Sequence, residues 1–328
     1  MPEPVWKEIF ADALPDPRYD AANPFQKRVH DNILTLFSPG WTPATATPKN
    51  LALASIFAVI AQAQSDFDAF AAKTLADNTN AVGQVRQAQD AFAAAMAATD
   101  VYLYQPVAGL VPTGYVRVRD ADLPAFGIKD DVTLVDDDTG FYSALYVKGA
   151  PRAPGTKYIL ANRGTDGDRD YWASALQDIG LPARQYQQAV AAAKAVTKVI
   201  DDTHGTVIYA GHSLGGGLAT LQALTIRRPG YVFQTAGVSP LTLEANGAEE
   251  VPPAKWVTAF DYHGDWLDDL QRGQGGVLLR PPIGWPVILP RIVMPKGAAD
   301  DNSNDWHLMN FVVPAMLQML KAGAWPHR

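Results

Sequence analysis

Apolar residues recur at helical spacing through the first third of the chain. Two alanine-rich stretches, 50–76 and 81–98, carry this pattern, and the segment 78–80 separates them. A repeat of about 3.6 residues predicts a helix in each stretch. The first stretch is apolar nearly all round, so its helix either packs inside the protein or faces lipid. We favour the buried helix. The longest apolar run, 51–61, is also too short for a membrane span, which needs about 20 residues.

From about residue 110 the pattern changes to short apolar runs separated by Gly, Pro and Asp. These runs predict strands and lie at 115–118, 132–135, 141–147, 157–162, 206–210, 232–236 and 256–260. Helical patterns over 182–201 and 217–224 lie between them. The alternation predicts an α/β fold, with a mostly parallel central sheet flanked by helices and preceded by a helical extension. We expect a helical region over 1–105 that packs on an α/β domain over 106–328.

One junction between a strand and a helix carries a chemical signature. The run 206–210 leads directly into Gly211-His212-Ser213-Leu214-Gly215-Gly216, and the helical pattern follows. The pattern G-x-S-x-G between a strand and a helix is typical of a nucleophile elbow, where a sharp turn exposes the serine hydroxyl. Small residues at Gly211 and Gly215 let the strand and the helix approach each other. A phosphate-binding loop would carry a Lys beside the serine, but the neighbours here are His212 and Leu214. We therefore expect Ser213 to be a nucleophile.

A serine hydroxyl is a weak nucleophile at neutral pH and needs a general base, which a carboxylate orients. In the chain order of α/β-hydrolases both follow the serine, the acid first. Three histidines follow Ser213, namely His263, His307 and His327. His327 is the penultimate residue, and His263 lies where the acid is expected. These positions leave His307 as the expected base.

The acid has four candidates, Asp261, Asp265, Asp268 and Asp269. Asp265 follows a glycine just beyond the run 256–260, where a loop can aim a carboxylate at the histidine. Asp261 lies closer to the strand itself, and the other two lie where a turn or helix can begin. We expect Asp265 to be the acid and keep Asp261 as the alternative.

The oxyanion of an acyl-transfer reaction also needs hydrogen-bond donors. The backbone N–H of Leu214, directly after the nucleophile, is the first expected donor. The second should come from an earlier strand end, and Asn162-Arg163-Gly164-Thr165 ends the run 157–162. Alone, Arg-Gly-Thr would be an ordinary turn. Together with the elbow it suggests that Thr165 supplies its N–H and its hydroxyl.

These motifs together resemble the class 3 (fungal-type) lipases, a family of α/β-hydrolases. The Arg-Gly-Thr strand end, Tyr171-Trp172 and the elbow carry the resemblance. Looser matches at 181–186, 236–238 and 270–271 narrow it to lipase-like domains of bacterial secreted effectors that attack phospholipids. It covers about residues 130–320. The family implies the α/β-hydrolase fold, a Ser213–Asp265–His307 triad, and an oxyanion hole at Thr165 and Leu214.

Two positions depart from the family pattern. Asn162 replaces the usual aromatic residue before Arg163, which suggests a change in packing. Ala175 stands where many members have Asp or Asn. The resemblance therefore leaves open how the oxyanion loop is held in place.

Composition narrows the classes of partner. The formal net charge of -7 argues against nucleic-acid binding, which needs a basic surface. The chain has no cysteine, so thiolate nucleophiles and cysteine-based zinc sites are excluded. Residues 1–8 lack the basic region and apolar stretch of a secretory signal peptide. We expect a soluble protein of the bacterial cytoplasm, or one exported into a target cell by a Sec-independent route.

The favoured function is hydrolysis of lipid esters through an acyl-enzyme, with no metal or organic cofactor. The apolar, proline-rich segment 277–295 is either a lid or a segment packed on the sheet, and with Trp266 it favours a lipid substrate. We expect a lipase or phospholipase A that acts at a membrane interface, as an effector with an immunity or inhibitor partner. The alternatives are an esterase for small or polymeric esters and a catalytically silent binding module.

Overall fold

The computed structural model describes residues 15–37, 40, 44–78, 80–129, 132–136, 138–164, 184–262, 267, 271, 281–292 and 309–326.

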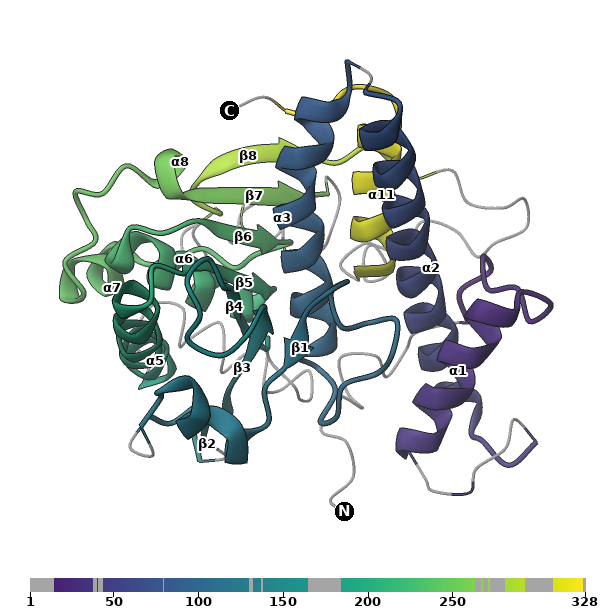
Figure 1. Cartoon of the computed structure of the whole chain (residues 1–328). Coiled ribbons are helices and arrows are strands. Elements are labelled where there is room, and N and C mark those ends of the chain that lie inside the picture. The colour runs from purple at the N-terminus through teal and green to yellow at the C-terminus, as the bar shows by residue number, and fades with distance from the viewer. Residues whose placement is uncertain are drawn as a thin grey trace.

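A mostly parallel sheet forms the centre of the molecule (Figure 1). Its order is β1 (Val116–Arg117), β3 (Phe141–Lys148), β4 (Lys157–Asn162), β5 (Thr206–His212), β6 (Gly230–Phe233), β7 (Val257–Asp261) and β8 (Trp285–Ile288), while β2 (Val135–Asp136) also pairs with β3. The strands from β4 to β8 are parallel, and β3 is antiparallel to both β1 and β4. After their first residues, β4 and β5 are buried throughout, as expected for strands covered on both faces. The expected α/β architecture is confirmed.

Helices cover both faces of this sheet. The helices α5 (Arg184–Asp202) and α6 (Leu214–Ile226) lie on one face and share an apolar core with it. The helices α2 (Pro48–Ala76), α3 (Val82–Asp100) and α11 (Met309–Lys321) share a second core with the other face. The helix α1 (Pro24–Phe37) packs against α2 (Figure 1). Short helical segments complete the described fold: η2 (Asp120–Phe126), α7 (Pro240–Ala245) and α8 (Pro253–Trp256).

The apolar helix α2 is buried within the protein. All residues of the stretch 52–61 are buried, and most of them pack in the core that the N-terminal helices share with the sheet. This agrees with the buried alternative for that stretch. No helix in the described part of the chain combines the length and the hydropathy needed to cross a membrane.

Two expectations about strands change in detail. The run 132–135 was expected to be a strand, but of these residues only Val135 belongs to β2. Leu134 buries its side chain in the core and accepts one hydrogen bond from the Ser143 N–H of β3 at 2.7 Å. Of the segment 277–295, residues 281–292 are described. They contain β8, which pairs with β7 at the edge of the sheet. Pro286 is tolerated there because an edge strand does not need every N–H. This part of the segment therefore belongs to the sheet.

Candidate active site

Ser213 lies on a sharp turn between β5 and α6, at the carboxyl edge of the sheet. Its φ of 57° and ψ of -129° form a backbone conformation that side-chain-bearing residues rarely adopt. The Ser213 N–H donates to the carbonyl of Phe233 at 3.1 Å, and its carbonyl accepts the N–H groups of Gly216 and Ala236, each at 3.0 Å. The turn is thus held both by its own helix and by the end of the neighbouring strand β6.

Close backbone contact explains two of the glycines at this turn. A Cβ atom on Gly211 would overlap the carbonyl of Gly215, and a Cβ on Gly215 would overlap the carbonyl of Asn162. The start of α6 therefore lies directly against the ends of β5 and β4. Larger residues at either position would push the helix, and the serine before it, away from the sheet.

The hydroxyl of Ser213 is buried beside the start of α6. The residue is 1% exposed, and its Oγ has no hydrogen-bond partner among the residues that the structure describes. Leu214 begins α6, so its N–H belongs to the first turn, where N–H groups lack partners within the helix. These N–H groups carry the positive end of the helix dipole, which favours negative charge beside them.

The end of β4 lies beside this turn and is joined to it by a tyrosine. Parallel pairing places Asn162 next to Gly211. Two residues further on, the Gly164 N–H donates to the Tyr102 hydroxyl at 3.1 Å. The same hydroxyl lies 3.0 Å from Nδ1 of His212. It can accept from Gly164 and donate its own proton to the imidazole when the histidine carries its proton on Nε2. Tyr102 thus connects the expected oxyanion strand end to the elbow.

A buried amide pair lies beneath the site. Nδ2 of Asn162 donates to Oε1 of Gln222 at 2.7 Å, and Nε2 of Gln222 donates to Oδ1 of Asn162 at 3.2 Å. Ser143 adds a hydrogen bond to the Asn162 side chain at 2.7 Å, and Gln222 donates to the carbonyl of Ala189 at 2.9 Å. The pair ties β3, β4, α5 and α6 together. It also gives a structural role to Asn162, where the resemblance to class 3 lipases implies an aromatic residue.

Three of the expected site residues, Thr165, Asp265 and His307, lie outside the described residues, as does Trp266. The alternative acid, Asp261, is described: it ends β7 and is 4% exposed. Among the described residues, Ser213, Leu214 and the strand end at Gly164 lie together. The acid and the base stay predictions. In the described part of the chain, no group of three or more His, Asp or Glu residues is placed to hold a metal ion.

Two described residues close in sequence to the expected acid and base contact each other. Tyr262, three residues before Asp265, packs edge-on against Phe311, with ring centroids 6.5 Å apart. Phe311 lies in the first turn of α11, four residues after His307. The Tyr262 N–H donates to Oε1 of Gln234 at 2.7 Å, which fixes the end of β7 against the end of β6. Both segments therefore approach the site edge of the sheet.

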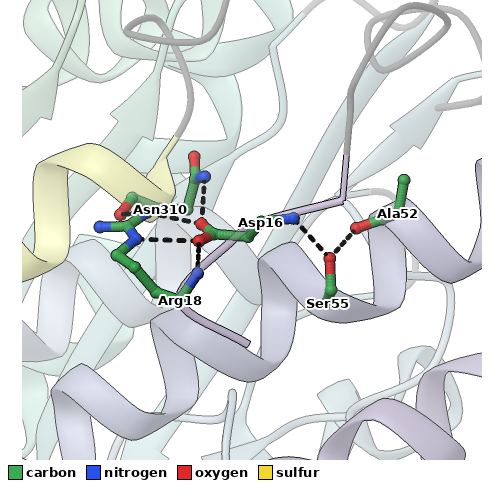
Figure 2. A network of polar contacts seen from close by, with 5 residues as sticks. All are labelled: Asp16, Arg18, Ala52, Ser55 and Asn310. Carbon is green, nitrogen blue, oxygen red and sulfur yellow. Dashed lines mark hydrogen bonds and ion pairs between the residues drawn. The ribbon is translucent and has the colours of Figure 1, made fainter. Parts of the chain in front are cut away.

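A polar network fastens the start of α11 to the N-terminal part of the chain (Figure 2). Nδ2 of Asn310 donates to Oδ2 of Asp16 at 2.8 Å, and Nη2 of Arg18 donates to the carbonyl of Asn310 at 2.8 Å. Arg18 also donates through Nε to Oδ1 of Asp16 at 2.9 Å. The Asp16 N–H donates to Oγ of Ser55 on α2 at 2.8 Å. The helix that follows the expected base is therefore held from outside the sheet.

Sequence reasoning missed Tyr102, Gln222 and the network around Asp16. Tyr102 is 62 residues from Gly164 and 110 residues from His212. No local pattern marks a contact across such separations.

Comparisons with known proteins add a separate line of evidence. A family model described as phospholipase-like, a Tle-like phospholipase domain, matches residues 93–283. The chain is also similar to the extracellular phospholipase A1 of Serratia liquefaciens, with 37% identity over 173 residues. The aligned region covers 53% of this chain and 50% of that protein, so the chain spans about half the length of this curated relative. The family match includes Tyr102 and Ser213 and ends before His307.

Proposed function

The chain belongs to the Tle-like phospholipase domain family, and from this premise we propose that it is a serine phospholipase of the A1 type. It would hydrolyse the sn-1 carboxylic ester of a glycerophospholipid at a membrane interface. The observation that carries the proposal is the placement of Ser213. It lies on a strained turn at the start of α6, its Oγ has no partner among the described residues, and the Gly164 strand end lies beside it. Similarity to an extracellular phospholipase A1 supports the substrate class.

In the proposed mechanism, Oγ of Ser213 bonds to the ester carbonyl carbon while its proton passes to His307. Asp265 stabilises the resulting imidazolium. The N–H groups of Leu214 and Thr165 bind the oxyanion, a contact that strengthens as negative charge develops. The intermediate collapses with cleavage of the ester C–O bond, and His307 gives the proton to the leaving lysophospholipid. Water then attacks the acyl-enzyme by the same route, which releases the fatty acid and regenerates the serine.

Product analysis on defined vesicles tests this function. The full chain is incubated with phosphatidylcholine that carries different fatty acids at sn-1 and sn-2, and the products are identified by mass spectrometry. We expect release of the sn-1 fatty acid and a 2-acyl lysophospholipid. Ser213→Ala and His307→Ala should each lower the rate about 10⁴-fold or more. Ser65→Ala, on the remote helix α2, is the matched control and should leave the rate unchanged.

Two outcomes would overturn parts of the proposal. Turnover of p-nitrophenyl butyrate without any release of fatty acid from vesicles would favour a small-ester esterase. Full activity in His307→Ala would remove that residue as the base. The effector role and an immunity partner stay predictions from the resemblance to secreted lipase-like domains.

A further inference from the structure

A buried ion pair lies behind the end of β4. Asp100, the last residue of α3, is fully buried, and Arg117 on β1 is 9% exposed. Nη1 of Arg117 lies 3.2 Å from Oδ2 of Asp100, and Tyr146 donates its hydroxyl to the same oxygen at 2.8 Å. Burial raises the pKa of the Asp100 carboxyl, and the charge of Arg117 opposes that shift. Removal of either partner of such a buried ion pair would strongly destabilise the folded protein, because the other charge would stay buried without compensation.

One nitrogen of Arg117 holds the turn that follows α3. Nη1 donates to the backbone carbonyls of Asp100 and Leu103, at 3.1 and 2.6 Å. The turn between these two carbonyls carries Tyr102, whose hydroxyl contacts Gly164. The guanidinium therefore fixes the backbone from which Tyr102 reaches the end of β4.

The other terminal nitrogen of Arg117 binds Tyr142, which in turn contacts the same strand end. Nη2 donates to the Tyr142 hydroxyl at 2.6 Å. The guanidinium of Arg163 lies over the Tyr142 ring, 4.6 Å from its centroid, and the Arg163 N–H donates to the Tyr142 carbonyl at 2.9 Å. Arg163 directly precedes Gly164. Two contacts to this strand end, those of Tyr102 and Tyr142, thus depend on one side chain.

We propose that Arg117, paired with Asp100, is a positioning residue for the oxyanion hole. It fixes the strand end at Arg163 and Gly164, which lies beside the elbow. The inference rests on the proposed function. Its physical basis is that an oxyanion donor acts through preorganisation, and a displacement of about 1 Å can cost about 10²-fold in rate.

Arg117→Lys tests the role. Lysine keeps the positive charge, but its single ammonium group cannot bind the turn after α3 and the Tyr142 hydroxyl at once, as the two terminal nitrogens of arginine do. We expect kcat for p-nitrophenyl butyrate to fall by about 10- to 100-fold with KM changed by less than about twofold. Inactivation by a fluorophosphonate should slow by the same factor, since it also builds negative charge on an oxygen at the site. Arg119→Lys is the matched control. The Arg119 side chain is 80% exposed in a surface pair with Asp122, so wild-type kinetics are expected.

Tyr142→Phe keeps the test decisive if Arg117→Lys does not fold. It removes the hydroxyl that Arg117 binds and leaves the ring beneath Arg163. We expect a smaller fall in kcat, about 3- to 10-fold, in a protein that melts within a few degrees of the wild type. Wild-type kcat in the folded variants, whatever their melting temperature, would overturn the positioning role. Absence of ester hydrolysis in the wild-type protein would instead contradict the proposed function.

Discussion

At the scale of single residues, the Tyr102 hydroxyl contacts both halves of the candidate site. It contacts the Gly164 N–H on one side and His212 on the elbow on the other. The two expected oxyanion donors, Thr165 and Leu214, each follow one of these partners within two residues. An atom bound to both partners therefore restricts the distance between Gly164 and the elbow.

Tyr102→Phe removes this hydroxyl and keeps the ring. The change leaves the N–H of Gly164 and a nitrogen of His212 buried with a partner lost, which costs roughly 1–3 kcal/mol of folding free energy. We expect a matching loss in denaturant unfolding and a fall of about 10-fold in kcat. Tyr104→Phe serves as the control, because Tyr104 is 43% exposed. Unchanged kcat in Tyr102→Phe would show that the hydroxyl does not hold the site together.

The residues that sequence alone could assign are those of the elbow. Six consecutive residues encode the turn, because the geometry of a strand, a sharp turn and a helix is local. Tyr102 and Arg117 act through contacts to β3, β4 and β5, and their side chains show no pattern that predicts such partners. The departure at Ala175 left open how this loop is held in place, and no sequence pattern pointed to Tyr102 or Arg117.

At the scale of elements, periodicity and apolar runs predicted most helices and strands well. The stretch 50–76 is α2 with two residues added at its start, and the expected helix over 182–201 is α5 within two residues. Short runs were less informative. Leu134 is buried without belonging to a strand. The strand β8 lies in a proline-rich segment whose sequence was equally consistent with a lid and with a segment packed on the sheet. Burial alone does not specify pairing, which depends on strands distant in the chain.

The anchoring of α11 gives a prediction at this scale. Asp16→Ala leaves Arg18 and Asn310 without their shared, fully buried carboxylate, and we expect the free energy of unfolding to fall by about 3 kcal/mol. Since α11 begins two residues after His307, kcat of the folded variant should also fall. Asp31→Ala is the control: Asp31 pairs with Lys27 on the surface of α1, and such pairs contribute little. Equal stability of Asp16→Ala and wild type, measured by urea unfolding, would contradict this anchoring.

At the scale of the whole molecule, helices from both ends of the chain complete one face of the sheet. The core on this face combines side chains of α2, α3 and α11 with side chains of β3, β4 and β5. The family match covers residues 93–283, so α2 and α11 lie outside it. Tyr102 and Arg117 join the end of α3 to the sheet, and Asp16 joins α2 to α11. The placement of the candidate site therefore depends on the assembled fold.

The central claim is that Ser213 is the nucleophile of this fold. Labelling of the folded full chain with a fluorophosphonate, followed by peptide mass spectrometry, tests it most directly. The account predicts one adduct, on the peptide that contains Ser213, and its loss in Ser213→Ala and after denaturation. A folded protein that stays unlabelled, or an adduct on a different serine, would contradict the claim.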